Sequence, residues 1–109
     1  MMPYEKLLAW KTAHQQLYVL TAQVRRAALS IPTNIAEGVA KSGSREFRRY
    51  LDISIGSASE LSYLLLFARD RGLLSVQNWA QIDSRRNRVG ELMCRLYRSI
   101  QHRANTLGQ

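Results

Sequence analysis

The sequence is poor in residues that could form covalent or metal cross-links. Its 109 residues include one cysteine, Cys94, so neither an intramolecular disulfide nor a cysteine-based metal site can form. Its two histidines, His14 and His102, lack the Glu-x-x-His and His-Glu-x-x-His spacings of helical metal sites. We therefore expect no metal and no cofactor, and we expect Cys94 to be a small, partly buried side chain rather than a reactive thiol.

Long apolar runs, linkers and catalytic motifs are absent as well. The longest apolar run, residues 63–68, is far shorter than the roughly 20 residues that span a bilayer. The first residues also lack the basic and apolar segments of a signal peptide. Because there is no Gly-rich phosphate loop, nucleophile elbow or acid pair, we expect no enzymatic activity and no small-molecule substrate. These absences predict a single cytoplasmic domain over residues 1–109 with no membrane partner.

Acidic residues are scarce relative to basic ones. The chain has 16 Lys and Arg against 8 Asp and Glu, which gives a net charge of +8 and a pI near 10.4. Most of the cations are arginines, whose planar guanidinium group suits phosphate oxygens and stacks on bases. The charge therefore favours a polyanionic partner, either nucleic acid or an acidic protein surface, over a merely solvated basic surface.

The apolar residues recur at helical spacing, with no strand-like alternation. A first helix starts at Tyr4, and a second carries Val24, Ala27, Ala28, Ile31 and Ile35 on one side. Ser44 can cap a third helix that ends near Arg71 and is followed by Gly72. Ser75 can cap a last helix with one apolar side, from Ile82 to Ile100. The pattern predicts an all-α, antiparallel, up-and-down four-helix bundle.

Pro32 lies inside the second predicted helix. It removes a backbone donor and crowds the carbonyl of Ala28, so we expect a bend there. Gly38 is suited to a left-handed residue that closes the helix before a loop at residues 41–44. Asn34 and Glu37 share a polar side where they could bind a ligand or fix a subunit contact, although such residues more often bond nearby backbone groups.

Two long motifs carry a resemblance to a known family. They are "QVRRAALSIPTNIAEG" at residues 23–38 and "REFRRYLDISIGSASEL" at residues 45–61, supported by "YEKLLAW" and "ARDRGLLS". Together they resemble the bacterial four-helix bundle proteins encoded within intervening sequences of large ribosomal RNA genes. The accessory variability determinant of diversity-generating retroelements shares that fold. The resemblance implies a ring, typically a pentamer, whose basic surface engages RNA or DNA, and it implies no catalytic activity.

The sequence departs from this family between the first two predicted helices. Family members usually carry there the rest of a long helix and a loop with proline and acidic residues, whereas residues 13–23 contain neither Gly nor Pro. Either a deletion leaves a stunted or fused first pair of helices, or the sequence lacks a segment. We favour a missing segment or a helix break at Thr21, which can cap the second helix, because a fused rod would leave only three helices.

The candidate nucleic-acid contacts are basic residues that cluster at helix ends or along one side of a helix. They are Arg25, Arg26, Lys41, Arg45, Arg48, Arg49, Arg88, Arg95 and Arg98. Arg45 and Arg49 repel each other at i, i+4 spacing unless an anion lies nearby. The competing role is salt bridging to Glu46, to Asp52 or to a neighbouring subunit.

The segment "LSYLLLF", residues 61–67, is apolar on nearly every side of a helix. This pattern is typical either of a subunit interface or of a helix central to the bundle. The candidate interface residues are Gly56, Ser59, Tyr63 and Phe67. Trp10 and Trp79 are expected to be core or interface anchors, and an exposed Trp79 could stack on a base.

The sequence thus predicts a non-enzymatic, homo-oligomeric basic bundle that binds RNA or DNA through phosphate contacts. The alternative is a protein-interaction scaffold that presents arginines to an acidic protein such as a reverse transcriptase.

Overall fold

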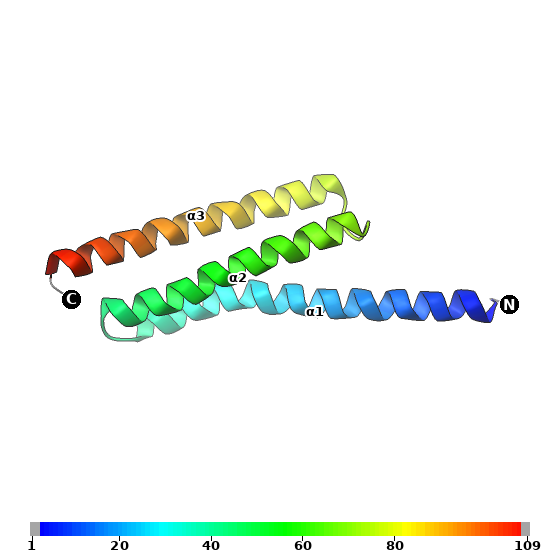
Figure 1. Ribbon diagram of the computed structural model, residues 1–109, viewed down its shortest axis with the longest axis horizontal. Helices are drawn as coiled ribbons and strands as arrows, with labels where there is room; N and C mark the ends of the chain where they lie inside the picture. The colour runs from blue at the N-terminus through cyan, green and yellow to red at the C-terminus, as the bar shows by residue number, and fades with distance from the viewer. Residues whose placement is uncertain (1–2, 108–109) are drawn as a thin grey trace.

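The computed structural model describes residues 3–107, and these residues form three helices (Figure 1). They are α1 (Tyr4–Ala40), α2 (Ser44–Asp70) and α3 (Val76–Leu107). The predicted all-α class is confirmed, and the described residues contain no strand. A four-helix bundle within one chain is not confirmed, since only three helices are present.

The first two predicted helices are fused into one. α1 is 37 residues long and is unbroken at Thr21, so the prediction of a break there is wrong. The Thr21 hydroxyl donates to the Leu17 carbonyl at 2.8 Å, which is a bond typical of a mid-helix threonine and not of an N-cap. The physical reason is local, because residues 4–31 contain no Gly or Pro that would terminate a helix.

Pro32 lies within α1 and does not end it. In Figure 1 the C-terminal part of α1 slopes away from the line of its N-terminal part, in keeping with the predicted bend. Gly38 does not close the helix, which continues to Ala40. The left-handed glycine of the following turn is Gly43, with φ of 95°.

Gly38 is instead buried where α1 meets α2. A Cβ at this position would lie 3.0 Å from the Tyr50 Cβ and 3.3 Å from the Phe47 ring. The glycine is therefore needed for the close approach of two helices and not for a left-handed conformation.

The predicted bounds of α2 and the start of α3 agree with the structure to within a residue. Gly43, rather than Ser44, occupies the N-cap position of α2. Gly72 follows α2 with φ of 74°, as a residue that closes a helix should. The Ser75 hydroxyl accepts a hydrogen bond from the Asn78 backbone N–H at 3.1 Å, so its predicted capping role is confirmed.

α2 is the central helix of a single layer. It packs against both other helices, while α1 and α3 lie on opposite sides of it and do not approach each other. The buried core is small, and the fully or largely buried apolar residues are Ala27, Leu51, Ala58, Leu61, Leu65, Ala68, Met93 and Ala104. Two serine contacts join α1 to α2: the Ser30 and Ser57 hydroxyls lie 2.7 Å apart, and the Ser54 hydroxyl donates to the Ile31 carbonyl at 2.9 Å.

The molecule is elongated. Its principal extents are 71 × 26 × 14 Å and its radius of gyration is 18.9 Å, against about 13 Å for a compact chain of this length. Every residue from Pro3 to Val19 is exposed. Figure 1 shows why: the N-terminal part of α1 projects past the end of α2. We refer to residues 4–19 as the arm.

One described helix, α2, is long and apolar enough to cross a membrane by length and composition. It is also the helix that packs against both others, and the core helix of a soluble protein meets the same criterion. The observation is therefore weak evidence for a membrane span.

Candidate nucleic-acid interface

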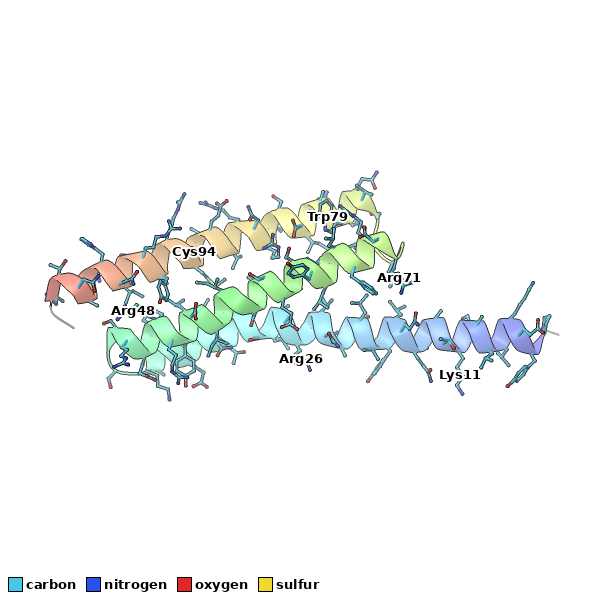
Figure 2. All side chains as sticks on the ribbon, in the orientation of Figure 1. Lys11, Arg26, Arg48, Arg71, Trp79 and Cys94 are labelled. Atoms are coloured by element: carbon cyan, nitrogen blue, oxygen red, sulfur yellow. The ribbon has the colours of Figure 1, made fainter. Side chains whose placement is uncertain are left out.

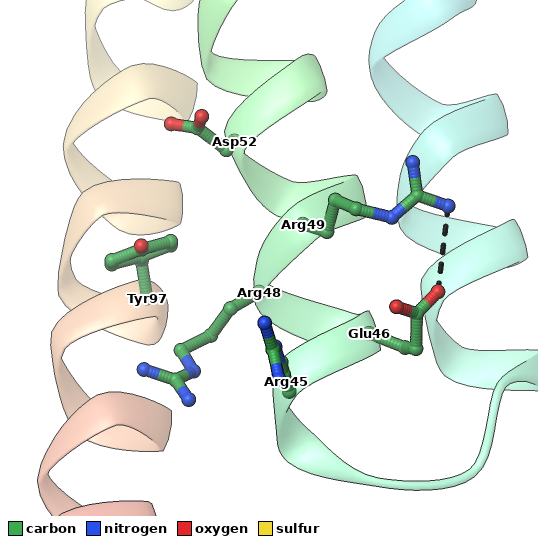
Figure 3. Close-up of a pocket in the computed structure, with 6 residues that line it drawn as sticks. All are labelled: Arg45, Glu46, Arg48, Arg49, Asp52 and Tyr97. Carbon is green, nitrogen blue, oxygen red and sulfur yellow. Dashed lines mark hydrogen bonds and ion pairs between the residues drawn. The ribbon is translucent and has the colours of Figure 1, made fainter.

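The densest group of predicted phosphate ligands lies at the start of α2. Arg45, Arg48 and Arg49 occupy its first two turns and line an open pocket with Glu46, Asp52 and Tyr97 (Figure 3). The pocket spans two helices, because Tyr97 comes from α3 and the other five residues come from α2. We refer to these six residues as the arginine pocket.

The charges of the arginine pocket are only partly neutralised. Arg49 forms an exposed ion pair with Glu46 at 3.4 Å, and the Arg48 Nε donates to the Ser44 carbonyl at 3.4 Å. Within residues 3–107, Arg45 makes no ion pair, and its side chain is exposed. The positive end of the α2 dipole adds to the same region, and Gly43 at the N-cap has no side chain that could cap this helix start. The pocket can therefore accept an anion such as a phosphate.

Tyr50 brings one further cation, Lys41, close to Arg49 of the pocket. The Lys41 ammonium lies 5.8 Å from its ring centroid, and the Arg49 guanidinium lies 4.7 Å from it. These cation–π contacts place the predicted ligand Lys41 next to Arg49 across the α1–α2 turn.

The other predicted ligands do not join this group. Arg25 and Arg26 are exposed on α1, and Figure 2 shows Arg26 well separated from Arg48. Arg88, Arg95 and Arg98 are exposed on α3, and the first of them pairs with Glu91 at 3.6 Å. None of these five arginines lines the arginine pocket, and those of α1 and of α3 lie on helices that are separated by α2.

Tyr97 is the residue of the arginine pocket that sequence reasoning missed. It is half-buried on α3, and Figure 3 shows Arg48 extending toward it from α2. A tyrosine beside arginines can stack on a base while the arginines hold the phosphate. The sequence analysis did not consider Tyr97, which follows Met93 by four residues along α3, and no motif in the sequence links it to Arg45, Arg48 and Arg49.

The two tryptophans have different surroundings. Trp79 is half-buried against the core cluster, which confirms a core role, and the Arg69 guanidinium lies 4.3 Å from its ring. The Trp79 indole N–H is buried without an acceptor among the described residues. Trp10 is 59% exposed on the arm and stacks on His14 with 5.1 Å between ring centroids, so it is not a core residue of this chain.

The polar residues around Pro32 support the helix packing. The Asn34 amide donates to the Ser30 carbonyl at 2.8 Å and to its hydroxyl at 2.9 Å, beside the contact to Ser57. Glu37 is exposed. Asn34 therefore bonds a nearby backbone group, as such residues more often do, and it supports the α1–α2 contact.

The candidate interface residues lie on the outer side of α2. Gly56 and Ser59 are exposed, Tyr63 is 76% exposed and Phe67 is 49% exposed, with the Arg71 guanidinium 5.2 Å from the ring of Phe67. α2 is thus central within the chain and still presents an unpaired apolar side. Cys94 is half-buried, and residues 3–107 contain no group of three potential metal ligands.

A comparison with protein families identifies a matching family. The model of the family described as "23S rRNA-intervening sequence protein" matches residues 4–95, which is most of the chain. No curated protein matches the sequence.

Proposed function

Since this chain belongs to the 23S rRNA-intervening sequence protein family, we propose that it is a non-enzymatic, homo-oligomeric protein that binds RNA or DNA through phosphate contacts. The observation that carries the proposal is the arginine pocket, where three arginines lie beside a tyrosine at the positive end of a helix. A net charge of +8 supports the same kind of partner. The proposal includes a cytoplasmic location and little sequence specificity.

The proposal also includes a ring-shaped assembly, a pentamer according to the family resemblance. Two features support self-association: the core of one chain is small, and large apolar side chains are exposed on all three helices. The four-helix bundle implied by the resemblance would then require a helix from outside the chain.

The test is fluorescence anisotropy of labelled RNA and duplex DNA at several salt concentrations. If about six phosphates are neutralised on duplex DNA, log Kd should change with log salt with a slope of magnitude about 5. Replacing both Arg45 and Arg48 by alanine should reduce that magnitude by about 2. The matched control removes two exposed cations of the arm, Lys6→Ala with Lys11→Ala, and should leave the slope nearly unchanged.

Equivalent alanine variants of the basic residues on α1 and on α3 identify which helix contacts the nucleic acid. Arg25→Ala with Arg26→Ala tests α1, and Arg88→Ala, Arg95→Ala and Arg98→Ala together test α3. Binding that does not weaken with salt would overturn the electrostatic mechanism.

A second candidate function is a protein-interaction scaffold for an acidic partner such as a reverse transcriptase. The exposed Tyr63 and Phe67 beside Arg71 favour it, because aromatic residues and arginine are typical of protein interfaces. A pull-down that survives nuclease treatment and is lost when Tyr63 and Phe67 are replaced would support this function over the first.

A further inference from the structure

The arm has an apolar side that is largely exposed. Leu7, Trp10 and Leu17 are 50%, 59% and 40% exposed, and they continue the line of Val24 and Ile31, which pack against the core cluster farther along α1. The spacing of seven residues from Trp10 to Leu17, Val24 and Ile31 keeps these side chains on one side of the helix. One continuous apolar stripe therefore begins in solvent and ends in the core.

α3 carries a matching line that is also unpaired. Ile82, Val89 and Leu96 are spaced by seven residues and are 40–43% exposed, while the neighbouring Met93 is buried against α2. Apolar side chains in such a regular line are normally covered by another helix.

The two lines face the same side of the layer. Viewed from the N-terminus of α1, Ile31 and Ile35 are rotated clockwise from Ala27, which is buried against α2. Viewed from the N-terminus of α3, Val89 and Leu96 are rotated anticlockwise from Met93, which is buried against α2. Because α1 and α3 run in the same direction on opposite sides of α2, these opposite rotations turn both lines to one side.

The two lines border the side of the layer that no other described helix covers, with Ile31 and Ile35 on α1 and Ile82, Val89 and Leu96 on α3, and we refer to this side as the groove. A helix laid in the groove would complete a four-helix arrangement and cover both lines. The arm cannot fold back into the groove of its own chain, because α1 is unbroken from Tyr4 to Ala40.

We propose that the groove is filled by the arm of a second copy of this chain. The arm is about 24 Å long and the rest of α1 about 30 Å, so an arm antiparallel to α1 fits within the groove's length. The arm carries only three charges, at Glu5, Lys6 and Lys11, and its apolar stripe matches the apolar borders of the groove. Every copy has both an arm and a groove, so arms exchange between copies, either in a pair or around a closed ring.

A pair of adjacent leucines gives a matched test. Leu7 and Leu8 are each 50% exposed, but Leu7 lies on the apolar stripe of the arm and Leu8 lies about 100° away from it. Leu7→Asp should weaken self-association by at least about tenfold, since it places a charge in the groove. Leu8→Asp should change it by less than about twofold, and Val89→Asp in the groove should weaken it as Leu7→Asp does. Sedimentation equilibrium measures all three, and circular dichroism checks that helical content is retained.

Trp10 reports directly on its own burial. On assembly, its emission should shift to shorter wavelength as protein concentration rises, and the shift should be absent from Trp10→Phe. Trp79 should not contribute, because it is already packed against the core of its own chain.

The inference rests on the proposed self-association, and the outcomes separate the two. An assembly that is equally stable in Leu7→Asp and Leu8→Asp, or that leaves Trp10 emission unchanged, would overturn arm exchange while self-association stands. A monomer at all concentrations would overturn both, and the salt titration would still decide nucleic-acid binding on its own. A pair or a ring that is sensitive to Leu7→Asp supports arm exchange.

Discussion

At the scale of single residues, the polar and small side chains near Pro32 have structural roles in the α1–α2 contact. Ser30, Asn34 and Ser57 are joined by hydrogen bonds of 2.7–2.9 Å, and Gly38 allows the two backbones to approach closely. The sequence identified these residues as a motif. It did not show which helix they face, because that depends on the packing partner.

Gly38→Ala should lower the free energy of unfolding by about 1–2 kcal/mol. The new Cβ would meet the Tyr50 Cβ at 3.0 Å, and the cost of overpacking exceeds the gain in helix propensity. Gly90→Ala in α3 is the matched control: its Cβ would meet nothing within 4 Å, so the free energy of unfolding should rise by up to about 1 kcal/mol. Urea denaturation measures both, and an equal gain for the two variants would contradict the close contact.

The arginines differ in whether an acidic side chain already pairs with them. Arg86 is tied to Asp83 at 2.7 Å and is largely buried, whereas Arg45 has no ion pair among the described residues. Sequence reasoning placed Arg45, Arg48 and Arg49 together correctly, since all three fall in two turns of one helix. It could not add Tyr97, which is brought to them only by the packing of α3 on α2.

At the scale of elements, the main correction concerns α1. The prediction of a break at Thr21 came from the expected number of helices and from the capping ability of threonine, but residues 4–31 contain no helix terminator. The lack of a helix terminator in the local sequence therefore explains why α1 is unbroken. The consequence is an arm whose residues, 4–19, are all exposed.

Amide hydrogen exchange of the arm should depend on protein concentration. In a dilute monomer, residues 4–19 should exchange quickly, because an isolated helix of this length is marginal in water. In the assembled protein their exchange should slow by at least about tenfold. The segment around Leu51 and Leu61 in α2 should stay protected at both concentrations, since it is buried within the chain. Arm protection that does not change with concentration would argue against burial of the arm by another copy.

At the scale of the whole molecule, the three helices form an open layer and not a closed bundle. The radius of gyration of 18.9 Å and the small core leave two apolar regions exposed, the groove with the arm on one side and the outer side of α2 on the other. A chain with so little buried apolar surface would gain stability from the proposed self-association.

The outer side of α2 provides a separate test of the ring. Tyr63→Glu with Phe67→Glu should reduce the mass of the assembly, because it places charges on a proposed subunit interface. Helical content should stay at the wild-type value, since the two side chains are 76% and 49% exposed within the chain. Leu29→Glu, at a side chain 66% exposed on α1, is the control and should leave the mass unchanged. Light scattering gives the mass. An unchanged mass for the double variant would remove Tyr63 and Phe67 from the interface.

The sequence by itself determined the helical class, the bounds of α2, the caps at Gly72 and Ser75, and the basic cluster at residues 45–49, because each depends on residues close together in the chain. Only the tertiary structure decided that Gly38 serves a close contact, that Tyr97 joins the arginines and that the arm is exposed along its whole length. The reason is that helical periodicity fixes which side of a helix is apolar, whereas the neighbour that covers this side is set by the packing of distant segments.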